Sequence, residues 1–586
     1  MVVSNNLWPD RSRGARPGTV EDMDVREEVR VLRAEVPLGP YPERVTDDLV
    51  RWGHERPGAT FLAERDGDGW RTIAFGAMLQ RVRTVAAALL ARGGSPDAPL
   101  AVIAPNGIEH AVVVLAAMYA GVPVSPISTG YAQPGSDPTR LRALLDVLTS
   151  FAMFVPDPSH AAVVAEANPS LPLLRDADAL EGEPLDADRA QATVGADSIA
   201  KILFTSGSTG TPKGVITTHR MLCANQTMLA QIWPAAVADP VLVDWAPWSH
   251  TAAGNKIFGI ALRHGGTFYV DEGKPAPGAF AATLRNLREI APTFYFNVPR
   301  GWALLADEFE HDPALAATFF SRVRVLLNAG ASIPEALRRR LAEFATRYAG
   351  RTVPVVSAWG ATETAPMATA VWGEYPAEPE TVGTPVPGVE IKLAPVDDLH
   401  ELRVRAVTVT PGYWRDPAAT AAAFDDEGYY KTGDAAELLD AADPSRGILF
   451  GGRIGENFKL ASGTWVNVGA LRLALLEAAN ELVDDVLLVG ADRDELGVLV
   501  FARAAASGDP AFRERLCDAL TEHNRRSARN STRIARALIL SAPPDAAAGE
   551  ITDKGSVNQR RALANRPLEV ARLLADPLDP QVLSLG

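Results

Sequence analysis

The chain has 586 residues, more than a single hydrophobic core usually serves, so we expect two or more domains. Its composition, 47% hydrophobic and 22% charged, is that of an ordinary soluble globular protein. The formal net charge of −15 argues against a protein whose main partner is nucleic acid or an anionic membrane, because phosphate-rich partners select basic surfaces.

The beginning of the chain is polar. Residues 1–40 are rich in arginine and glutamate, and we expect them to form a partly ordered arm. Residues 1–18 lack the apolar core of a secretory signal. The most apolar run, residues 111–120, is too short to span a bilayer and is better explained as a buried helix. We therefore expect no insertion into a membrane.

The two cysteines, Cys223 and Cys517, lie far apart in the sequence. Neither has a second cysteine or a histidine at the spacing of a metal site or a disulfide framework. Free cysteines of this kind are usually small buried apolar residues. Their pattern favours a reducing compartment, and we expect a cytoplasmic protein.

Helical patterns alternate with short β-rich runs through the first two thirds of the chain. Residues 100–106 read as a strand, 108–120 as an apolar helix and 122–127 as a second strand. Residues 199–210 and 322–344 repeat the order of strand, glycine-bearing turn and helix or approach to a helix. This alternation predicts βαβ units and a largely parallel sheet covered by helices.

The remaining third of the chain has a different pattern. A β-rich stretch at residues 389–409 precedes the turn 411–417, and the last 130 or so residues read as a smaller α+β domain. We expect an α/β fold with a large domain of layered sheets and helices, a β-rich subdomain and a small mobile α+β domain. The expected boundaries are an arm at 1–40, a large domain at 41–454 and a small domain at 455–586.

The strongest local signal is the segment 205–214, TSGSTGTPKG, which follows the strand-like run 199–204. Glycines let the backbone approach an anion, hydroxyl groups and amides donate to phosphate oxygens, and lysine adds positive charge. The spacing excludes a P-loop, since Pro212 occupies the position of its second glycine and Gly214 that of its serine or threonine. The residues expected to hold phosphate are Thr205, Ser206, Gly207, Ser208, Thr209, Gly210 and Lys213.

This segment resembles the phosphate loop of the adenylate-forming superfamily, which includes acyl-CoA synthetases, luciferases and the adenylation domains of peptide synthetases. Four more segments resemble motifs of that family and follow in the family's order: WGATET at 359–364, YKTGD at 430–434, GR at 452–453 and GEITDKG at 549–555. Together the five motifs are highly specific.

The resemblance implies roles for particular residues. Glu363 would bind Mg²⁺ and Thr362 would touch the phosphate, whereas Asp434 would accept hydrogen bonds from the ribose hydroxyls of ATP. Arg453 would contact the nucleotide, and Lys554 would be the catalytic lysine. These roles agree with the chemistry, because a carboxylate that attacks the α-phosphate of ATP brings two anions together and needs positive charge at that place.

The acyl and adenine sites are less sharply defined by the sequence. The resemblance places His250 beside the acyl carboxylate, although a histidine with a purely structural role is an open alternative. Asn297 resembles a residue that borders the acyl group, and Met367 lines the pocket or simply packs in the core. The residues expected to contact the nucleotide or coenzyme A also include Gly330, Ala331, Trp359, Gly360 and Lys459.

The region from Arg453 onward departs from the common pattern of the superfamily. Gly455 stands where most members have Asp or Lys at the point about which the domains swivel. Residues 458–469, FKLASGTWVNVG, and residues 551–560, ITDKGSVNQR, are similar to feruloyl-CoA synthases. The resemblance therefore implies that the substrate is a hydroxycinnamate such as ferulate, or another aromatic acid.

Several alternatives stay open. The acceptor of the acyl group is free coenzyme A or the phosphopantetheine of a separate carrier protein, and a homologue that binds nucleotide without catalysis is a third reading. The basic run 523–536 either meets the 3′-phosphate of coenzyme A or is a solvated helix face. The sequence predicts ATP, Mg²⁺, coenzyme A and a small carboxylic acid as ligands, and it leaves the oligomeric state open.

Overall fold

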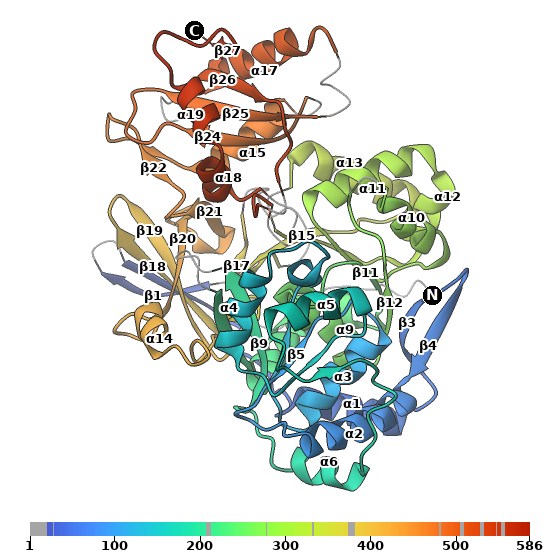
Figure 1. Ribbon diagram of the computed structural model, residues 1–586. Coiled ribbons are helices and arrows are strands. Elements are labelled where there is room, and N and C mark those ends of the chain that lie inside the picture. Colours follow the sequence, from blue (N-terminus) through green and yellow to red (C-terminus); the bar gives the residue numbers. More distant parts are fainter. Residues whose placement is uncertain are drawn as a thin grey trace. The chain divides into compact units, whose positions relative to one another are not determined.

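The computed structural model describes residues 20–26, 29–206, 212–276, 278–330, 333–372, 381–479, 482–503, 509–527, 532–545, 548–551 and 557–585. The chain divides into two compact units (Figure 1). The large unit consists of Met1–Ala394, Arg403–Thr432 and Leu438–Ile448. The small unit consists of Pro395–Leu402, Gly433–Glu437 and Leu449–Gly586. Among the residues just given, no helix is both long and apolar enough to cross a membrane.

The first sheet of the large unit has the strand order β10-β9-β6-β5-β7-β8. Its strands β5, β6, β7, β8 and β9 run parallel, and β10 pairs antiparallel with β9. The βαβ unit predicted between residues 100 and 127 is confirmed. The strands are β5 (Leu100–Val102), β6 (Val124–Pro126), β7 (Ala152–Phe154), β8 (Leu173–Leu174), β9 (Ile199–Ser206) and β10 (Pro212–Thr218).

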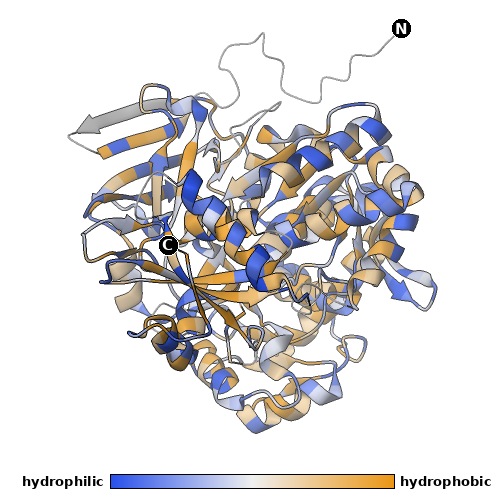
Figure 2. Ribbon diagram, turned by 90° about the horizontal axis from the view of Figure 1, so that it is seen from above, coloured by the Kyte–Doolittle hydropathy of each residue, from blue (hydrophilic) through white to orange (hydrophobic). Residues whose placement is uncertain are grey.

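Helices pack around this sheet (Figure 1). Most of α3 is buried on all sides, which agrees with its almost uniformly apolar sequence. Figure 2 shows hydrophilic and hydrophobic residues side by side on many of the helices, as expected where one helix face covers a sheet. These helices are α1 (Val45–Glu55), α2 (Phe75–Ala91), α3 (Ile108–Tyr119), α4 (Pro138–Leu148), α5 (Pro158–Ala167), α6 (Pro184–Gln191) and the 3-10 turn η1 (Thr129–Ala132).

Two further sheets complete the layers of the large unit. One has the order β11-β12-β3-β4 and the other β13-β14-β15-β16-β17. Within the second, β13, β14 and β15 run parallel, so their carboxyl ends lie at the same edge. The strands are β3 (Thr60–Asp66), β4 (Gly69–Ala74), β11 (Val241–Asp244), β12 (Thr267–Val270), β13 (Phe294–Asn297), β14 (Val325–Asn328), β15 (Val355–Trp359), β16 (Thr369–Ala370) and β17 (Thr384–Pro385).

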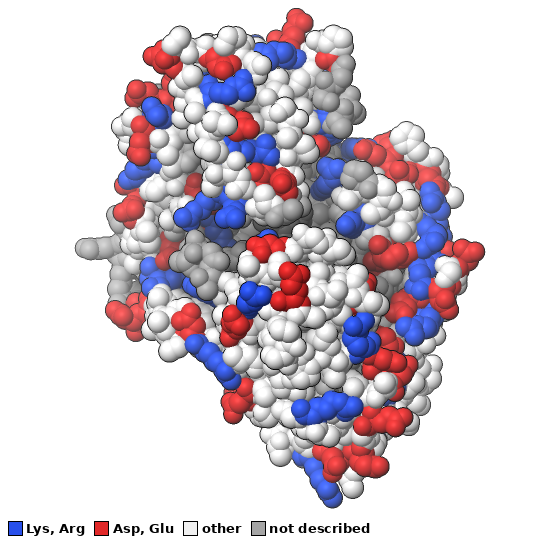
Figure 3. Space-filling model, in the orientation of Figure 1, with Lys and Arg blue, Asp and Glu red and all other residues white. Residues whose placement is uncertain are grey.

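Helices also pack with these two sheets. A π-helix, η2 (Ala252–Ile257), continues into α9 (Phe258–His264). Lys and Arg are interspersed with Asp and Glu on the face shown in Figure 3. The helices are α7 (His219–Ile232), α8 (Pro234–Val237), α10 (Phe280–Glu289), α11 (Pro299–His311), α12 (Pro313–Arg322) and α13 (Glu335–Ala349).

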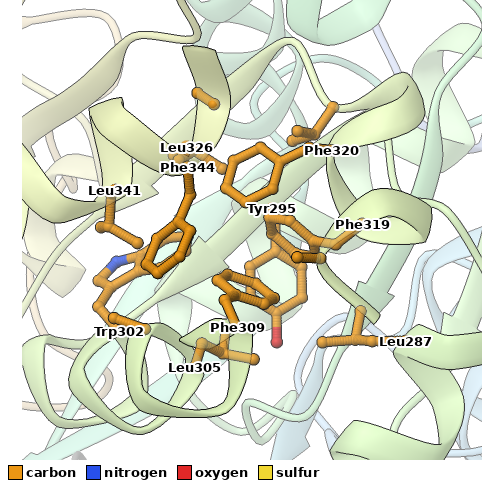
Figure 4. Close-up of a cluster of buried hydrophobic side chains, with 14 of the residues drawn as sticks. Leu287, Tyr295, Trp302, Leu305, Phe309, Phe319, Phe320, Leu326, Leu341 and Phe344 are labelled. Carbon is orange, nitrogen blue, oxygen red and sulfur yellow. The ribbon is translucent and has the colours of Figure 1, made fainter. Parts of the chain in front are cut away.

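An aromatic core fixes the position of β13 and β14. The ring of Tyr295, on β13, lies 5.5 Å from that of Trp302 and 5.1 Å from that of Phe319, centroid to centroid. Phe309 makes similar edge and tilted contacts with Phe319 and with two further phenylalanines (Figure 4). Such pairs contribute about 0.5–1.5 kcal/mol each beyond the area they bury. The strands that carry part of the candidate site are therefore held rigidly.

A six-stranded sheet has the order β1-β2-β18-β19-β20-β21. β2 lies within the segment expected to form an arm, and it pairs antiparallel with β18, Arg33 opposite Glu390. The chain passes between the two units within β18, β19, β20 and β21. The strands are β1 (Val20–Arg26), β2 (Val29–Ala34), β18 (Val389–Val396), β19 (Leu399–Ala406), β20 (Tyr430–Leu438) and β21 (Ile448–Arg453), with α14 (Pro417–Ala423) and the 3-10 turn η4 (Pro444–Arg446) between them.

The small unit is built on the mixed sheet β24-β25-β26-β27. Alternate residues of β25 enter two cores, with Val498 and Val500 on one face and Leu499 and Phe501 on the other. Helix α15 packs on β24, and α19 packs on β25. The elements are β22 (Phe458–Lys459), β23 (Trp465–Val466), α15 (Val468–Ala478), β24 (Val483–Val489), β25 (Leu496–Ala502), α17 (Phe512–Arg526), β26 (Ile534–Leu540), α18 (Gln559–Asn565), α19 (Pro567–Leu573) and β27 (Val582–Ser584).

Candidate active site

The segment expected to hold phosphate is the connection of the β9–β10 hairpin. Lys213 pairs with Thr205 and Pro212 with Ser206 across the two antiparallel strands. Thr205 and Lys213 therefore stand opposite each other in neighbouring strands. Four of the predicted phosphate-binding residues lie outside the described residues: Gly207, Ser208, Thr209 and Gly210.

The turn 411–417 packs directly on this hairpin. The backbone amide of Trp414 donates to the carbonyl oxygen of Gly214 at 2.7 Å, and Tyr413 forms an isolated β-bridge with Val215. The ammonium of Lys213 lies 5.1 Å from the centroid of the Tyr413 ring. A cation above an aromatic face is attracted by the negative centre of the ring, so Tyr413 helps to orient Lys213.

A carboxylate and two tyrosines form a buried cluster beside Lys213. The hydroxyl of Tyr413 donates to Oε1 of Glu363 at 3.1 Å, and Glu363 is only 8% exposed. Burial, followed by the negative charge of Glu363, raises the pKa of both Tyr413 and Tyr430 above the ordinary value. Both phenols therefore stay protonated at neutral pH and serve as hydrogen-bond donors.

Glu363 is held at the end of β15 by a tight turn. A Cβ on Gly360 would lie 1.5 Å from the carbonyl oxygen of Pro366, so a glycine is required where the backbone turns. The 3-10 turn η3 (Thr362–Thr364) follows, and the backbone amide of Thr410 donates to the carbonyl oxygen of Glu363 at 2.8 Å. Thr362 is half-buried next to Glu363 in the chain.

The carboxyl edge of the sheet β13–β14–β15 brings separate sequence motifs together. Asn297 pairs with Asn328, and Asn328 with Ser357, in neighbouring parallel strands. Trp359 ends β15, and Gly330 follows β14 with φ +89°, a left-handed conformation that favours glycine. Ligands of open α/β sheets bind at such carboxyl edges. Ala331, the other residue expected near adenine, lies outside the described residues.

His250 precedes the π-helix η2. Its Nδ1 accepts a hydrogen bond from the backbone amide of Ala252 at 3.2 Å, so the ring proton belongs on Nε2. The carbonyl oxygen of His250 accepts from the amide of Gly254 at 2.8 Å. π-Helical turns occur often at functional sites. The histidine thus has a structural contact through one nitrogen and carries its proton on the other.

Asp434 and Arg453 form an ion pair within the small unit, Nε to Oδ1 at 2.9 Å. Asp434 is buried, whereas more than half of the Arg453 side chain is exposed. Lys459 pairs with Asp398 at 3.0 Å and stays substantially exposed. The two residues expected to contact ribose and nucleotide are therefore neighbours in space, although they lie apart in the sequence.

Lys554 lies outside the described residues, but the ends of its loop are defined. Ile551 and Val557 form an isolated β-bridge on either side of it. Glu550, just before the loop, is 2% exposed and pairs with Arg566 at 2.7 Å. A buried ion pair of this kind is costly to break, so it anchors the base of the loop.

Tyr413 and Tyr430 were not among the predicted site residues. Each lies in a segment that the sequence marks, Tyr413 in the turn 411–417 and Tyr430 at the start of YKTGD. The sequence around neither tyrosine indicates that its hydroxyl contacts Glu363, because Glu363 is distant in the chain, 50 residues from Tyr413.

Glu363 has the right chemistry for Mg²⁺ held together with ATP. Magnesium is usually bound by one or two carboxylates and by substrate phosphates, with water in its other positions. Across the parts of the chain that the structure describes, no group of three or more His, Cys, Asp or Glu could form an all-protein metal site. A single buried carboxylate of this kind, Glu363, has the chemistry for a metal that arrives with the nucleotide.

Comparisons with known proteins agree with this geometry. The family described as AMP-binding enzyme matches residues 49–414, and the AMP-binding enzyme C-terminal domain matches residues 458–574. The chain is 30% identical over 419 residues to a feruloyl-CoA synthase from Amycolatopsis sp, covering 68% of this chain and 76% of that protein. It is 29% identical over 387 residues to a sulfoacetate–CoA ligase from Cupriavidus necator, covering 63% and 71%.

Solved structures support the fold. ATP-bound MatB from Rhodopseudomonas palustris has a TM-score of 0.68 at 21% identity, with 89% of this chain and 98% of that chain covered. The o-succinylbenzoate CoA synthetase MenE from Bacillus subtilis, in complex with its acyl-adenylate, has a TM-score of 0.71 at 19% identity with the same coverage. The predicted α/β fold class is confirmed.

Proposed function

The chain belongs to the AMP-binding enzyme family, and we propose that it is an AMP-forming ligase that joins a carboxylic acid to coenzyme A. Curated relatives that are named CoA ligases support this proposal, although their acids differ. The single observation that carries it furthest is the cluster of Lys213, Tyr413 and Glu363, in which one tyrosine contacts both a cation and a buried carboxylate.

The reaction proceeds in two steps. A carboxylate oxygen of the acid attacks the α-phosphorus of ATP, the bond to pyrophosphate breaks, and pyrophosphate leaves with the electron pair. The thiol of coenzyme A then attacks the acyl carbon of the adenylate. Its proton passes to solvent, and AMP leaves with the electron pair of the broken C–O bond. Without the first step, the thiol would have to displace an oxide ion from the carboxylate, which is a poor leaving group. The first step replaces it with AMP, which leaves more easily.

The chain's residues supply binding and charge for the first step. Lys213 and the amides of the 205–214 loop hold the β- and γ-phosphates, and Lys554 offsets the charge that builds where the carboxylate meets the α-phosphate. Glu363 would hold Mg²⁺, which would supply further positive charge at the phosphates. Tyr413 and Tyr430 orient the Glu363 carboxylate.

Asp434 holds the ribose through its carboxylate, which can accept hydrogen bonds from two hydroxyl groups. Arg453 contacts the nucleotide beside it, and the ion pair between the two residues supports this proposal. For the second step, residues 455–586 rotate about Gly455, which lies within the small unit, so that Lys554 leaves and the thiol enters. A glycine accepts wider changes in its backbone angles than any other residue, which supports a hinge at Gly455.

The preferred acid in this proposal is a hydroxycinnamate such as ferulate, or another aromatic acid. The support is the similarity of residues 458–469 and 551–560 to feruloyl-CoA synthases, together with the relative of that name at 30% identity. Another relative is a sulfoacetate–CoA ligase, so the choice of acid needs a direct test.

The test is to incubate the purified protein with MgATP, coenzyme A and single acids, and to measure AMP and acyl-CoA. The acids are ferulate, p-coumarate, benzoates and medium-chain fatty acids. We expect AMP and thioester in equal amounts, with ferulate or p-coumarate fastest. A benzoate or fatty acid in first place would refute the substrate assignment alone. AMP without thioester would indicate a carrier protein as acceptor, and no AMP with any acid would refute the ligase.

A further inference from the structure

Glu401, on β19, is a buried carboxylate to which the proposed chemistry assigns no role. Side chains alternate between the two faces of a strand, so Glu401 lies on the face opposite to that of Leu402 and Val404, which are both fully buried. Even so, Glu401 is only 7% exposed. A buried carboxylate is costly unless it accepts hydrogen bonds, so its donors indicate what it does in the fold.

One donor to Glu401 is a backbone amide next to Asp434. The amide of Gly433 donates to Oε1 of Glu401 at 2.9 Å. The strands that carry these two residues, β19 and β20, are neighbours in the six-stranded sheet, and both residues belong to the small unit. The contact therefore joins Glu401 to the residue directly before the one that holds the ribose in the proposed function.

The backbone at Gly433 departs from the regular strand. Its φ is +71°, a left-handed conformation that favours glycine. The carbonyl oxygen of Gly433 accepts from the amide of Ile454, just after β21, at 2.9 Å. The two peptide groups that flank the Cα of Gly433 are therefore each fixed by a hydrogen bond, one from the side chain of Glu401 and one from the backbone of Ile454.

These hydrogen bonds limit where the carboxylate of Asp434 can lie. A single methylene separates this carboxylate from the backbone, so a rotation of the preceding peptide group moves it as well. Arg453 also contacts Oδ1 of Asp434, but more than half of the arginine side chain is exposed. An exposed ion pair holds its partners less firmly than a buried hydrogen bond does.

The ribose contact requires an accurate orientation of Asp434. One carboxylate can accept hydrogen bonds from two vicinal hydroxyls, but both of its oxygens must then be placed together. Hydrogen bonds weaken steeply as their geometry departs from linear. A small rotation of Asp434 would therefore weaken binding of the ribose even though the aspartate is still present.

Resting on the proposed function, in which Asp434 holds the ribose, we propose that Glu401 is a positioning residue for ATP. By accepting the hydrogen bond of the Gly433 amide, Glu401 orients Asp434 so that its carboxylate meets the 2′- and 3′-hydroxyls together. In this role Glu401 acts through Asp434 and takes no part in the chemical steps.

The first test compares ATP with 2′,3′-dideoxyATP, which lacks both hydroxyls, using the full-length enzyme and the fastest acid of the panel. Pyrophosphate release gives kcat and KM for each nucleotide. We expect wild type to prefer ATP by about 10- to 100-fold in kcat/KM, the usual effect of hydrogen bonds to a charged group. Asp434→Ala should lose this preference. Equal values for the two nucleotides in wild type would overturn the ribose contact and the inference with it.

The second test uses Glu401→Met, which keeps the length of the side chain and removes the acceptor. We expect kcat/KM with ATP to fall about tenfold, mainly through KM, and that with 2′,3′-dideoxyATP to change less than about threefold. A general loss of stability would instead affect both nucleotides alike. Glu401→Gln keeps an accepting oxygen and should stay within about threefold of wild type. An equal loss in Glu401→Gln would overturn the inference, because the accepted hydrogen bond would not be what matters.

Thr293→Val is the matched control. The hydroxyl oxygen of Thr293 is also buried and also accepts from a backbone amide, that of Val241, at 2.9 Å. It does so at the start of β11, in the large unit. This variant should lose stability and keep the wild-type preference for ATP over 2′,3′-dideoxyATP. A collapse of the preference in both Thr293→Val and Glu401→Met would overturn the inference.

Glu401→Asp serves if the methionine variant does not fold, as judged by circular dichroism and thermal denaturation. It keeps the charge and withdraws the acceptor by one methylene, so it should lose part of the preference for ATP. A preference that is unchanged in a folded Glu401→Met or Glu401→Asp, but lost in Asp434→Ala, would overturn the inference while the ribose contact stands. Absence of pyrophosphate release with every acid would instead refute the proposed function, so the two failures are distinguishable.

Discussion

The hydroxyl of Tyr413 donates a hydrogen bond of 3.1 Å to Oε1 of Glu363, and so joins the turn 411–417 to the motif that follows β15. The face of the same tyrosine ring receives the ammonium of Lys213. One aromatic side chain thus orients a carboxylate through its edge and a lysine through its face. Glu363 and Lys213, which the sequence assigns to Mg²⁺ and to phosphate, therefore both contact the same uncharged side chain.

Tyr413→Phe should weaken adenylation and raise the concentration of Mg²⁺ needed. The variant keeps the ring that faces Lys213 and removes the donor to Glu363, so the carboxylate loses part of its orientation. The expected loss is about tenfold in the rate of AMP formation at limiting Mg²⁺, from one hydrogen bond to a charged group. Titrating Mg²⁺ at fixed ATP measures it.

Tyr429→Phe is the control for that experiment. The hydroxyl of Tyr429 also donates to a glutamate, Glu390, at 3.0 Å, but in the six-stranded sheet. This variant should lose a similar amount of stability and keep the wild-type Mg²⁺ dependence. Identical Mg²⁺ curves for both variants would contradict the role assigned to Tyr413.

Lys554→Ala should reduce formation of the acyl-adenylate by several orders of magnitude, because it removes positive charge where the transition state needs it. ATP binding, measured by calorimetry without acid, should change much less, since Lys213 and Asp434 remain. Lys274→Ala, the same substitution at an exposed lysine, should behave as wild type. Normal adenylation by the Lys554 variant would remove that residue from the mechanism.

His250→Asn separates the two readings of this histidine. The Oδ1 of asparagine can replace Nδ1 as the acceptor for the amide of Ala252, while the group at Nε2 is lost. We expect the structure and stability to persist and the KM for the acid to rise roughly tenfold, as for one lost polar contact to a charged group. Unchanged kinetics in both His250→Asn and His250→Ala, across a panel of acids, would assign His250 a purely structural role.

The burial of Lys201 predicts that the free energy of unfolding depends on pH. Burial lowers its pKa from 10.5 to about 7 in the folded protein, so the unfolded chain binds more protons between these values and the free energy of unfolding rises with pH there. From pH 7 to pH 9 this group should contribute an increase of about 2 kcal/mol. Urea denaturation of wild type and Lys201→Met at both pH values measures it. Parallel curves for the two proteins would show that Lys201 does not titrate in this range.

The sequence marks most of the candidate site because its residues lie in short contiguous motifs. The order of strand, glycine-rich turn and Lys213 marks a phosphate loop from the sequence alone. The contact between Tyr413 and Glu363 could not be predicted, because it depends on how the turn 411–417 packs on β10 and not on any local pattern. The π-helix escapes prediction for the same reason, since contacts with Trp248 and Gln226 shape it.

The segment near the amino terminus illustrates a different difficulty. Residues 20–34 carry many charges, which favours a solvated arm in a reading of composition alone. Yet β2 finds its partner in β18, more than 350 residues later, and Leu32 is fully buried there. Pairing over such a separation leaves no clear local trace, because Val31 and Leu32 are adjacent and both buried, which breaks the period of two expected for a strand.

The division of the chain into two units affects how chimaeras between this protein and its relatives should be designed. The chain passes from one unit to the other five times, after Ala394, Leu402, Thr432, Glu437 and Ile448. A chimaera made with a single crossover at residue 454 would therefore inherit Glu401, Asp434 and Arg453 from one parent and the helix α15 from the other. The hydrogen bond from the Asn457 amide to the carbonyl oxygen of Gly451 would then join residues from different parents. Exchange of the short segments 395–402 and 433–437 together with residues 449–586 would keep such pairs from the same ancestor.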